Sequence, residues 1–315
     1  MNSEFPIFKF AQGDAALPET LWNVPHPPES LFVQCDPQSL TLFHKLPELG
    51  LAVVGTRNPQ PRMRAFLESR IAELAPTSLV IVSGMARGID SVAHASALRA
   101  GLPTVGILGT GLDLAYPKES LPLRSLILKQ GGLLVSEFPP GTRGFQSNFL
   151  QRNRLIAGWT QATWVVEASY RSGALNTAHW AREQNRTCFA VPSFPGDPTL
   201  SGNQTLLDRD HALPFWGVHS LGASWLELAT GTQSLNPKSS PTQDHPQIDL
   251  LRGTDAEALC LKVKQMTHIQ GGVQIPEILN WALTGGWKPE QFFVALDLSL
   301  KSKRIRDFFG TLVST

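Results

Sequence analysis

Residues 51–55, LAVVG, begin a pattern that recurs through the middle of the chain: a short apolar run, a glycine-rich turn and a helix-like stretch. The later apolar runs are SLVIVSG (78–84), PTVGILG (103–109), GLLVSE (132–137), TWVVEA (163–168) and TCFAVP (187–192). Runs this short, rich in Val and Ile and apolar on both faces, are typical of strands buried in a parallel sheet. With the helix-like stretches between them, they predict a doubly wound α/β fold.

The flanking sequence divides the chain further. Residues 1–45 contain Pro18, Pro25, Pro27 and Pro28, which exclude long helices and predict an extended N-terminal lead-in to a core domain over 46–229. Residues 230–247 are polar and rich in Ser, Thr and Pro, which indicates a linker. Residues 248–315 contain three helix-like stretches and then KRIRDFFGTLVS, which predicts a hairpin turning at Gly310. This order is the outline of a small winged-helix-like domain.

Composition excludes several classes of protein. Hydrophobic residues make up 42% and charged residues 17% of the chain, so it can bury a core and is not disordered. It has no apolar run of 18 residues and no signal-peptide pattern, which predicts a cytoplasmic protein that does not span a membrane. The cysteines, Cys35, Cys188 and Cys260, lie far apart and form no CxxC pair, so we expect reduced thiols and no metal site.

Donor groups cluster where the predicted strands end. These ends read GTR, SGMARG, GTG, SEFPPG, EASYRSG and PSFPGD, and they include Arg57, Arg87 and Arg171. The carboxyl ends of parallel strands share one edge of a sheet, and glycine, hydroxyls and helix N-termini there suit phosphates. Any single turn of this kind also has a purely structural explanation. The chain lacks a Walker pattern, and no GxGxxG opens its first unit, which argues against ordinary ATP hydrolysis and dinucleotide binding.

Residues 147–158, SNFLQRNRLIAG, set Arg152, Asn153 and Arg154 between apolar neighbours. Guanidinium groups in such a setting need a partner. One alternative is a nucleic-acid backbone, because an arginine can donate two parallel hydrogen bonds to a phosphate. The other is an internal ion pair with Glu137 or Glu167. The residues alone leave both alternatives open.

Taken together, these motifs resemble the DNA processing protein A (DprA/Smf) family over residues 27–229. The motifs are VVGTR (53–57), VSGMARGIDSVAH (82–94), GILGTGLDLAYP (106–117), VSEFPPG (135–141), FLQRNRLIAG (149–158) and VVEASYRSGALNTAHWA (165–181). The resemblance implies an extended Rossmann-like domain with a mostly parallel sheet and an optional C-terminal winged helix. It also implies a protein that binds single-stranded DNA, forms a homodimer and loads the RecA recombinase during natural transformation, without enzymatic activity or a cofactor.

With the strand-end turns, the resemblance predicts a DNA-binding pocket. Its members are Arg57, Ser83, Gly84, Arg87, Gly88, Phe149, Arg152, Asn153, Arg154, Arg171, Ser172 and Gly173, with Lys118 and Arg143 as further candidates. Phe149 and Phe145 offer faces for base stacking. We expect His94 to be a packing histidine and Glu167 to accept hydrogen bonds from the helix that follows it. The sequence departs from the family pattern at Gln204 and Asp210, where the family has Asn and Gly.

An enzyme is the alternative. Nucleoside-monophosphate phosphoribohydrolases have a related Rossmann core, and EASYRSGALNT would cradle a phosphate while Glu167 or Glu183 assisted cleavage of the glycosidic bond. Their PGGxGTxxE motif is absent, and His179 and Trp180 stand where its catalytic glutamate would fall. A carboxylate is needed there to activate water or stabilise the ribosyl cation.

Overall fold

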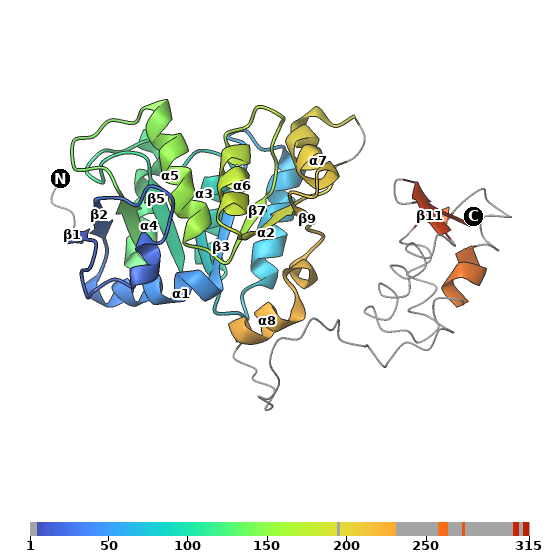
Figure 1. Cartoon of the computed structure of the whole chain (residues 1–315), viewed down its shortest axis with the longest axis horizontal. Helices are drawn as coiled ribbons and strands as arrows, with labels where there is room; N and C mark the ends of the chain where they lie inside the picture. The colour runs from blue at the N-terminus through green and yellow to red at the C-terminus, as the bar shows by residue number, and fades with distance from the viewer. Residues whose placement is uncertain are drawn as a thin grey trace. The chain divides into compact units, whose positions relative to one another are not determined.

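The computed structural model describes residues 5–193 and 196–230, and in the C-terminal part 258–263, 273–274, 305–308 and 311–314. The chain divides into two compact units, Met1–Leu235 and Asn236–Thr315. Figure 1 shows the whole chain coloured from its N-terminus to its C-terminus. Each unit is considered by itself.

A single sheet forms the centre of the first unit, with the strand order β1-β2-β6-β5-β4-β3-β7-β8-β9. Its neighbours from β6 to β9 pair in parallel, whereas β1–β2 and β2–β6 pair antiparallel. All the strands predicted from the apolar runs are confirmed. The strands are β1 (Ile7–Ala11), β2 (Ser30–Gln34), β3 (Gly50–Val54), β4 (Val80–Ser83), β5 (Thr104–Leu108), β6 (Leu133–Ser136), β7 (Ala162–Val165), β8 (Thr187–Ala190) and β9 (Leu213–Pro214).

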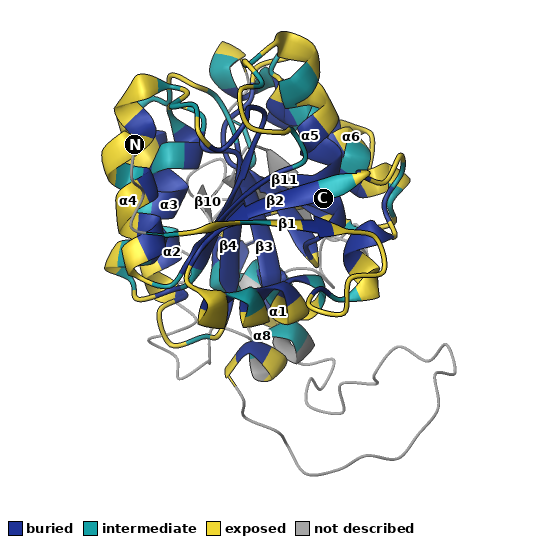
Figure 2. Cartoon of the chain, turned by 90° about the vertical axis from the view of Figure 1, so that its left-hand side faces the viewer, coloured by how far each residue is buried: buried dark blue, intermediate teal, exposed yellow. Residues whose placement is uncertain are grey.

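Helices cover both faces of this sheet (Figure 2). Because side chains alternate along a strand, Leu51 and Val53 join the core on one face and Ala52 and Val54 join the core on the other. The first face is covered by α2 (Pro61–Glu73), α3 (Ile89–Arg99) and α4 (Leu121–Lys129), and the second by α1 (Leu42–Leu49), α5 (Gln146–Gly158) and α6 (Ala174–Glu183). Two short helices follow, α7 (Ser201–Asp208) and α8 (Ala223–Thr230).

The N-terminal segment differs from the predicted extended lead-in. Residues 7–11 and 30–34 form β1 and β2, which extend the sheet beyond β6. Leu21, Trp22 and Leu31 are buried in the main core, and Trp159 donates from its indole Nε1 to the carbonyl of Leu21 over 2.8 Å. Residues 5–45 therefore belong to the core domain, because their apolar side chains cover one end of the sheet.

In the second unit, the described residues include one helical turn and a small sheet. Residues 258–263 are helical, and β11 (Ile305–Phe308) pairs antiparallel with β12 (Thr311–Ser314), as the predicted hairpin requires. A short strand, β10 (Val273–Gln274), pairs with the other side of β12. The predicted linker over 230–247 lies outside the described residues except for Thr230. Since the other two predicted helices also lie outside them, the winged helix stays a prediction.

Candidate nucleic-acid interface

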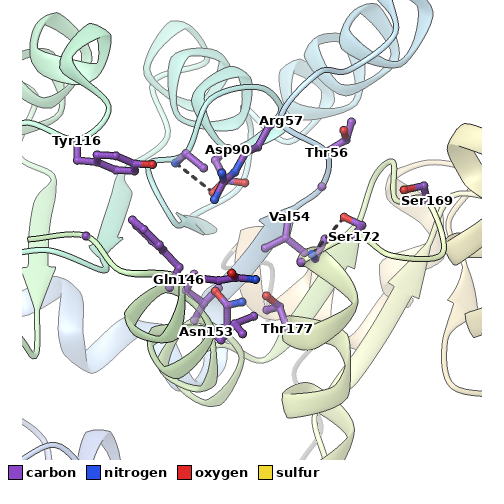
Figure 3. A pocket seen from close by; sticks show the side chains of 18 residues that line it. Val54, Thr56, Arg57, Asp90, Tyr116, Gln146, Asn153, Ser169, Ser172 and Thr177 are labelled. Carbon is purple, nitrogen blue, oxygen red and sulfur yellow. Dashed lines mark hydrogen bonds between the residues drawn. The ribbon is translucent and has the colours of Figure 1, made fainter.

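The carboxyl ends of β3 and β7 meet where the strand order changes direction. From β3 the chain continues to β4, its neighbour toward one edge of the sheet. From β7 it continues to β8, its neighbour toward the opposite edge. Open α/β sheets bind ligands at this point. A hollow of about 620 Å³ lies there, and we call it the switch-point pocket (Figure 3). Its polar and aromatic lining includes Thr56, Arg57, Asp90, Tyr116, Gln146, Phe149, Asn153, Ser169, Ser172, Gly173 and Thr177.

A second hollow, of about 380 Å³, adjoins the first at the end of β5, and we call it the β5 pocket. The two pockets share Arg57, Ala86, Tyr116 and Phe149 in their linings. The remaining lining of the β5 pocket includes Gly84, Met85, Arg87, Leu108, Gly109, Thr110, Pro117, Lys118 and Glu119. Besides the shared Arg57 and Phe149, two more of the predicted site residues, Gly84 and Arg87, line this hollow, and so does Lys118.

Arg57 is the cation that both pockets share. Its side chain is exposed, and its Cζ lies 5.9 Å from the centroid of the Phe149 ring. No hydrogen bond or ion pair engages its guanidinium within the described part of the chain. Figure 3 shows Arg57 between Tyr116 on one side of the pocket and Ser169 and Ser172 on the other. Arg57 therefore has its donors available for an anion.

Glycine 88 fixes the turn that carries Arg57. Gly88 has φ +83°, and a Cβ added to it would come within 2.3 Å of the carbonyl oxygen of Thr56. This close approach lets the N–H of Ile89, at the start of α3, donate to the same carbonyl over 3.1 Å. Ser83 is buried and donates from Oγ to the carbonyl of Val53 over 2.6 Å. Both residues thus position the rim without lining either pocket.

An aromatic pair borders both pockets. The rings of Tyr116 and Phe149 lie 5.2 Å apart between centroids, at 32°. Phe149 is half-buried, because its ring packs closely against Gly109 and Gly144. A Cβ added to these glycines would come within 2.6 and 2.8 Å of the ring. Tyr116 is 45% exposed. The ring that is open for stacking is therefore chiefly that of Tyr116, which lies against the closely packed Phe149.

The first turn of α6 closes the far side of the switch-point pocket. Ser172 accepts a hydrogen bond from the N–H of Ala174 over 3.3 Å, and an added Cβ at Gly173 would meet no heavy atom within 4 Å. Helix N-termini favour negative charge. Arg171 is exposed beside this turn but lines neither pocket. The exposed Arg143 also lies outside both linings.

Arg152 lies inside the fold instead of in the pocket. It is 4% exposed and donates from Nη1 to the carbonyls of Gly84, over 2.8 Å, and Ile107. Its Nε donates to Oδ1 of Asn153 over 3.2 Å. Burial lowers the pKa of Arg152 to about 10, although the nearby Asp90 carboxylate opposes the shift. The structure gives Arg152 a positioning role in place of the predicted phosphate contact, because its donors hold β5 and the turn after β4.

Arg154 is fully occupied by internal partners. It is 2% exposed and forms a forked ion pair with Glu137, with Nη1–Oε1 and Nη2–Oε2 distances of 2.6 and 2.7 Å. The remaining donors reach the carbonyls of Pro25, His26 and Gln151. All five N–H groups of the guanidinium are therefore used. The internal ion-pair alternative is confirmed for Arg154, and the phosphate contact predicted for it is corrected.

Of Arg152, Asn153 and Arg154, Asn153 is the one that lines the pocket. It lines the switch-point pocket while being 8% exposed, and its Nδ2 donates to Oδ1 of Asn176 over 3.1 Å. Because its amide group bonds Arg152 and Asn176 at the same time, Asn153 ties α5 to α6 at the base of the pocket.

The carboxylates that the enzymatic alternative needs lie elsewhere. Glu167 is buried and accepts a hydrogen bond from the N–H of Gln60 over 3.0 Å, so it holds the start of α2, not of the helix that follows it. Burial raises the pKa of Glu167. Glu183 lies at the last residue of α6, near His179 and Arg182. Neither glutamate lines either pocket.

His94 is a packing histidine, as predicted. It is fully buried, and its Nδ1 lies 2.7 Å from Oγ1 of Thr104. Burial, aided by the charge of Arg152, lowers the pKa of His94 from 6.5 to about 3. Its ring is therefore neutral in the folded protein near neutral pH.

This burial predicts a pH-dependent contribution to stability. Below pH 6.5 the unfolded chain takes up a proton at His94 that the folded chain does not, so stability falls between pH 6.5 and 3, by up to about 1.4 kcal/mol per pH unit. Replacing His94 with glutamine should remove this contribution. Urea unfolding of both proteins at pH 7, 6 and 5 measures this contribution. The difference between their free energies of unfolding should change as the pH falls. A difference that stays constant would show that His94 does not titrate as stated.

Sequence reasoning did not single out Tyr116, Gln146, Ser169 or Thr177 as site residues. Tyr116 stands in the motif GILGTGLDLAYP, where it precedes Pro117. An aromatic residue in a segment that follows a strand is a signal for base stacking, and the sequence contains this signal at Tyr116. The others carry short or amide side chains without a distinctive pattern, so their place in the lining depends on the fold.

Comparison with known proteins identifies the family. The family model described as DNA recombination-mediator protein A matches residues 9–222. The chain belongs to this family. Its match to Protein Smf of Synechocystis sp. is 40% identical over 182 residues, which is 58% of this chain and 45% of that protein's length.

Two solved DprA structures resemble the fold. DNA processing protein A from Streptococcus pneumoniae is 34% identical with a TM-score of 0.61, over 70% of this chain and 74% of that one. The Helicobacter pylori protein, whose structure is described in terms of a single-stranded DNA binding mode, is 27% identical with a TM-score of 0.60, over 70% of this chain and 96% of that one. They support the Rossmann-like α/β fold with a mostly parallel sheet.

No helix among the described residues is long and apolar enough to cross a membrane. In the same part of the chain, no three His, Cys, Asp or Glu side chains gather closely enough to hold a metal ion.

Proposed function

We propose that this member of the DNA recombination-mediator family binds single-stranded DNA in the switch-point pocket. The observation that carries the proposal is the exposed guanidinium of Arg57 at the meeting point of β3 and β7, which forms no hydrogen bond or ion pair with any residue that the structure describes. Arg57 donates to a phosphate there, and the open N-terminus of α6 faces the same hollow. The single-stranded DNA binding mode of the related H. pylori protein supports this choice of ligand.

Single strands suit this pocket better than a duplex. The exposed ring of Tyr116 offers a stacking face, and stacking on an aromatic side chain typically contributes about 1–3 kcal/mol per base. In a duplex the bases are already stacked and paired, so only a free strand can place a base there without a further cost. Arg57 supplies the contact to the phosphate, which does not depend on sequence.

The family resemblance extends the proposal to partners. We propose that the chain forms a homodimer and loads the bound strand onto the RecA recombinase during natural transformation. This role needs binding and release alone, and it uses no covalent step.

Gly173 provides the test of the pocket. It has φ −60° and open space around its Cβ position, so a larger residue fits the backbone and meets no neighbour. Gly173→Glu should weaken the binding of a fluorescent oligo-dT at least tenfold, because it places a carboxylate where the phosphate binds. An acidic residue at a helix N-terminus is not destabilising, so the fold should be retained.

The matched control is Gly173→Gln, which has nearly the same shape without the charge. It should bind within about threefold of the original protein, since a change of that size is below 1 kcal/mol. Fluorescence anisotropy measures both. If the glutamate variant binds oligo-dT as tightly as the glutamine variant does, the strand does not occupy this pocket.

A further inference from the structure

We propose that the β5 pocket is a second nucleotide subsite, so that two successive nucleotides of one strand lie on opposite sides of the Tyr116–Phe149 pair. This inference rests on the proposed binding of single-stranded DNA. It adds a site that the switch-point pocket does not include, at the end of β5 and the start of the segment that leads to α4.

The two pockets have a common border. Both rings line both pockets, and so does Arg57, whose Cζ lies 5.9 Å from the centroid of Phe149. A cation placed there can reach a phosphate that links a nucleotide in one pocket to a nucleotide in the other. The partly exposed ring of Tyr116 then lies between the two bases.

The β5 pocket carries an excess of positive charge. Its lining brings together the exposed side chains of Arg57, Arg87 and Lys118, against the single carboxylate of Glu119. This excess of positive charge suits a phosphodiester backbone. The Arg57 and Arg87 guanidiniums come from the turns after β3 and β4, and the Lys118 ammonium follows Pro117, so three separate segments converge on one hollow.

The size and lining of the β5 pocket also suit a nucleotide. Its volume, about 380 Å³, falls in the range of pockets that hold a small ligand, about 300–1,000 Å³. Gly84 and Gly109 form part of its lining, and Gly109 has no room for a side chain because an added Cβ would come 2.6 Å from the Phe149 ring. Leu108 and Met85 supply an apolar contribution to the lining.

Occupation of both subsites has a consequence for specificity. Two neighbouring bases that lie on opposite sides of an aromatic pair are not stacked on each other. A duplex would have to break both the stacking and the pairing of those bases, whereas a single strand gives up only its own weak stacking. The paired pockets therefore favour single strands more strongly than one pocket would.

The experiment uses a fluorescent 12-mer of dT, displaced by pdT or by the dinucleotide pdTpdT. We expect pdTpdT to displace the 12-mer at a concentration at least fivefold below that of pdT. Lys118→Glu should remove most of this advantage and leave displacement by pdT unchanged, since Lys118 lines only the β5 pocket. Lys45→Glu is the matched control, because Lys45 is exposed on α1, which leads into the opposite end of β3, and it should behave as the original protein does.

The outcomes separate this inference from the proposed function. If the protein does not bind the 12-mer, both fail. If it binds the 12-mer and Gly173→Glu weakens that binding, the proposed function stands. The second subsite is then overturned by equal displacement with pdT and pdTpdT, by no displacement with pdTpdT, or by an advantage of pdTpdT that Lys118→Glu does not reduce.

Discussion

Arg154→Ala is expected to lower the free energy of unfolding by about 3–5 kcal/mol, the cost typical of removing one partner from a buried ion pair. The Glu137 side chain is 4% exposed, and each of its carboxylate oxygens accepts a hydrogen bond from Arg154. Without Arg154 it would remain buried without its cation, and the carbonyls of Pro25 and His26 would lose their donors. This large effect follows because the same guanidinium joins α5, the end of β6 and the N-terminal segment.

Urea unfolding at pH 7 measures this change. Glu137→Ala should destabilise the protein comparably, since it leaves the Arg154 charge buried instead. Arg171→Ala is the control, because an exposed arginine with no described ion pair should change stability by no more than about 0.5 kcal/mol. A loss below about 1 kcal/mol for Arg154→Ala would mean that the buried pair does not hold the N-terminal segment.

Arg57→Ala is expected to weaken binding to single-stranded DNA at least tenfold while leaving stability within about 0.5 kcal/mol of the original protein. A hydrogen bond to a charged group contributes about 1.5–3 kcal/mol. Apart from its contact with the Phe149 ring, the Arg57 guanidinium has no hydrogen-bond or ion-pair partner among the described residues, so its removal breaks no such bond inside the fold. The salt dependence of binding should also become shallower, by about 0.7 in the slope of log K against log salt concentration.

Arg171→Ala again provides the comparison. It removes the same charge from the same edge of the sheet, but Arg171 lines neither pocket. Its effect on affinity should therefore be smaller than that of Arg57→Ala. Equal losses for the two variants would indicate a diffuse attraction to the charged rim in place of a contact at Arg57.

The parallel core could be predicted from sequence because its strands are buried on both faces. LAVVG and the similar runs carry Val, Ile and Leu at consecutive positions, and this signal does not depend on distant residues. Strands β1 and β2 carry no such signal. IFKFA (7–11) lies at the edge of the sheet with several exposed positions, and the prolines around it fit an extended segment equally well. Only the pairing with β6 shows that this segment completes the sheet.

The location of the candidate site could be predicted from the sequence, but the partners of its arginines could not. The glycine-rich strand ends located the pocket, since the fold itself brings them to one edge. The partners of Arg152 and Arg154 were not predictable, because a buried arginine and one that binds a phosphate have the same local sequence. Glu137 and the carbonyls of Pro25 and His26 are distant in sequence from Arg154. Arg57 differs from these arginines in forming no hydrogen bond or ion pair within the described ranges.

Arg57, whose guanidinium forms no hydrogen bond or ion pair in the part of the chain that the structure describes, is proposed to capture unpaired DNA at the switch point. The most direct measurement is an anisotropy titration of fluorescent oligo-dT with the original protein and with Arg57→Ala, at two salt concentrations, with a matched duplex alongside. We predict tight binding of oligo-dT that weakens with salt, much weaker binding of the duplex, and at least a tenfold loss in the variant. Oligo-dT binding that is equally tight in both proteins, or no tighter than duplex binding, would contradict the account.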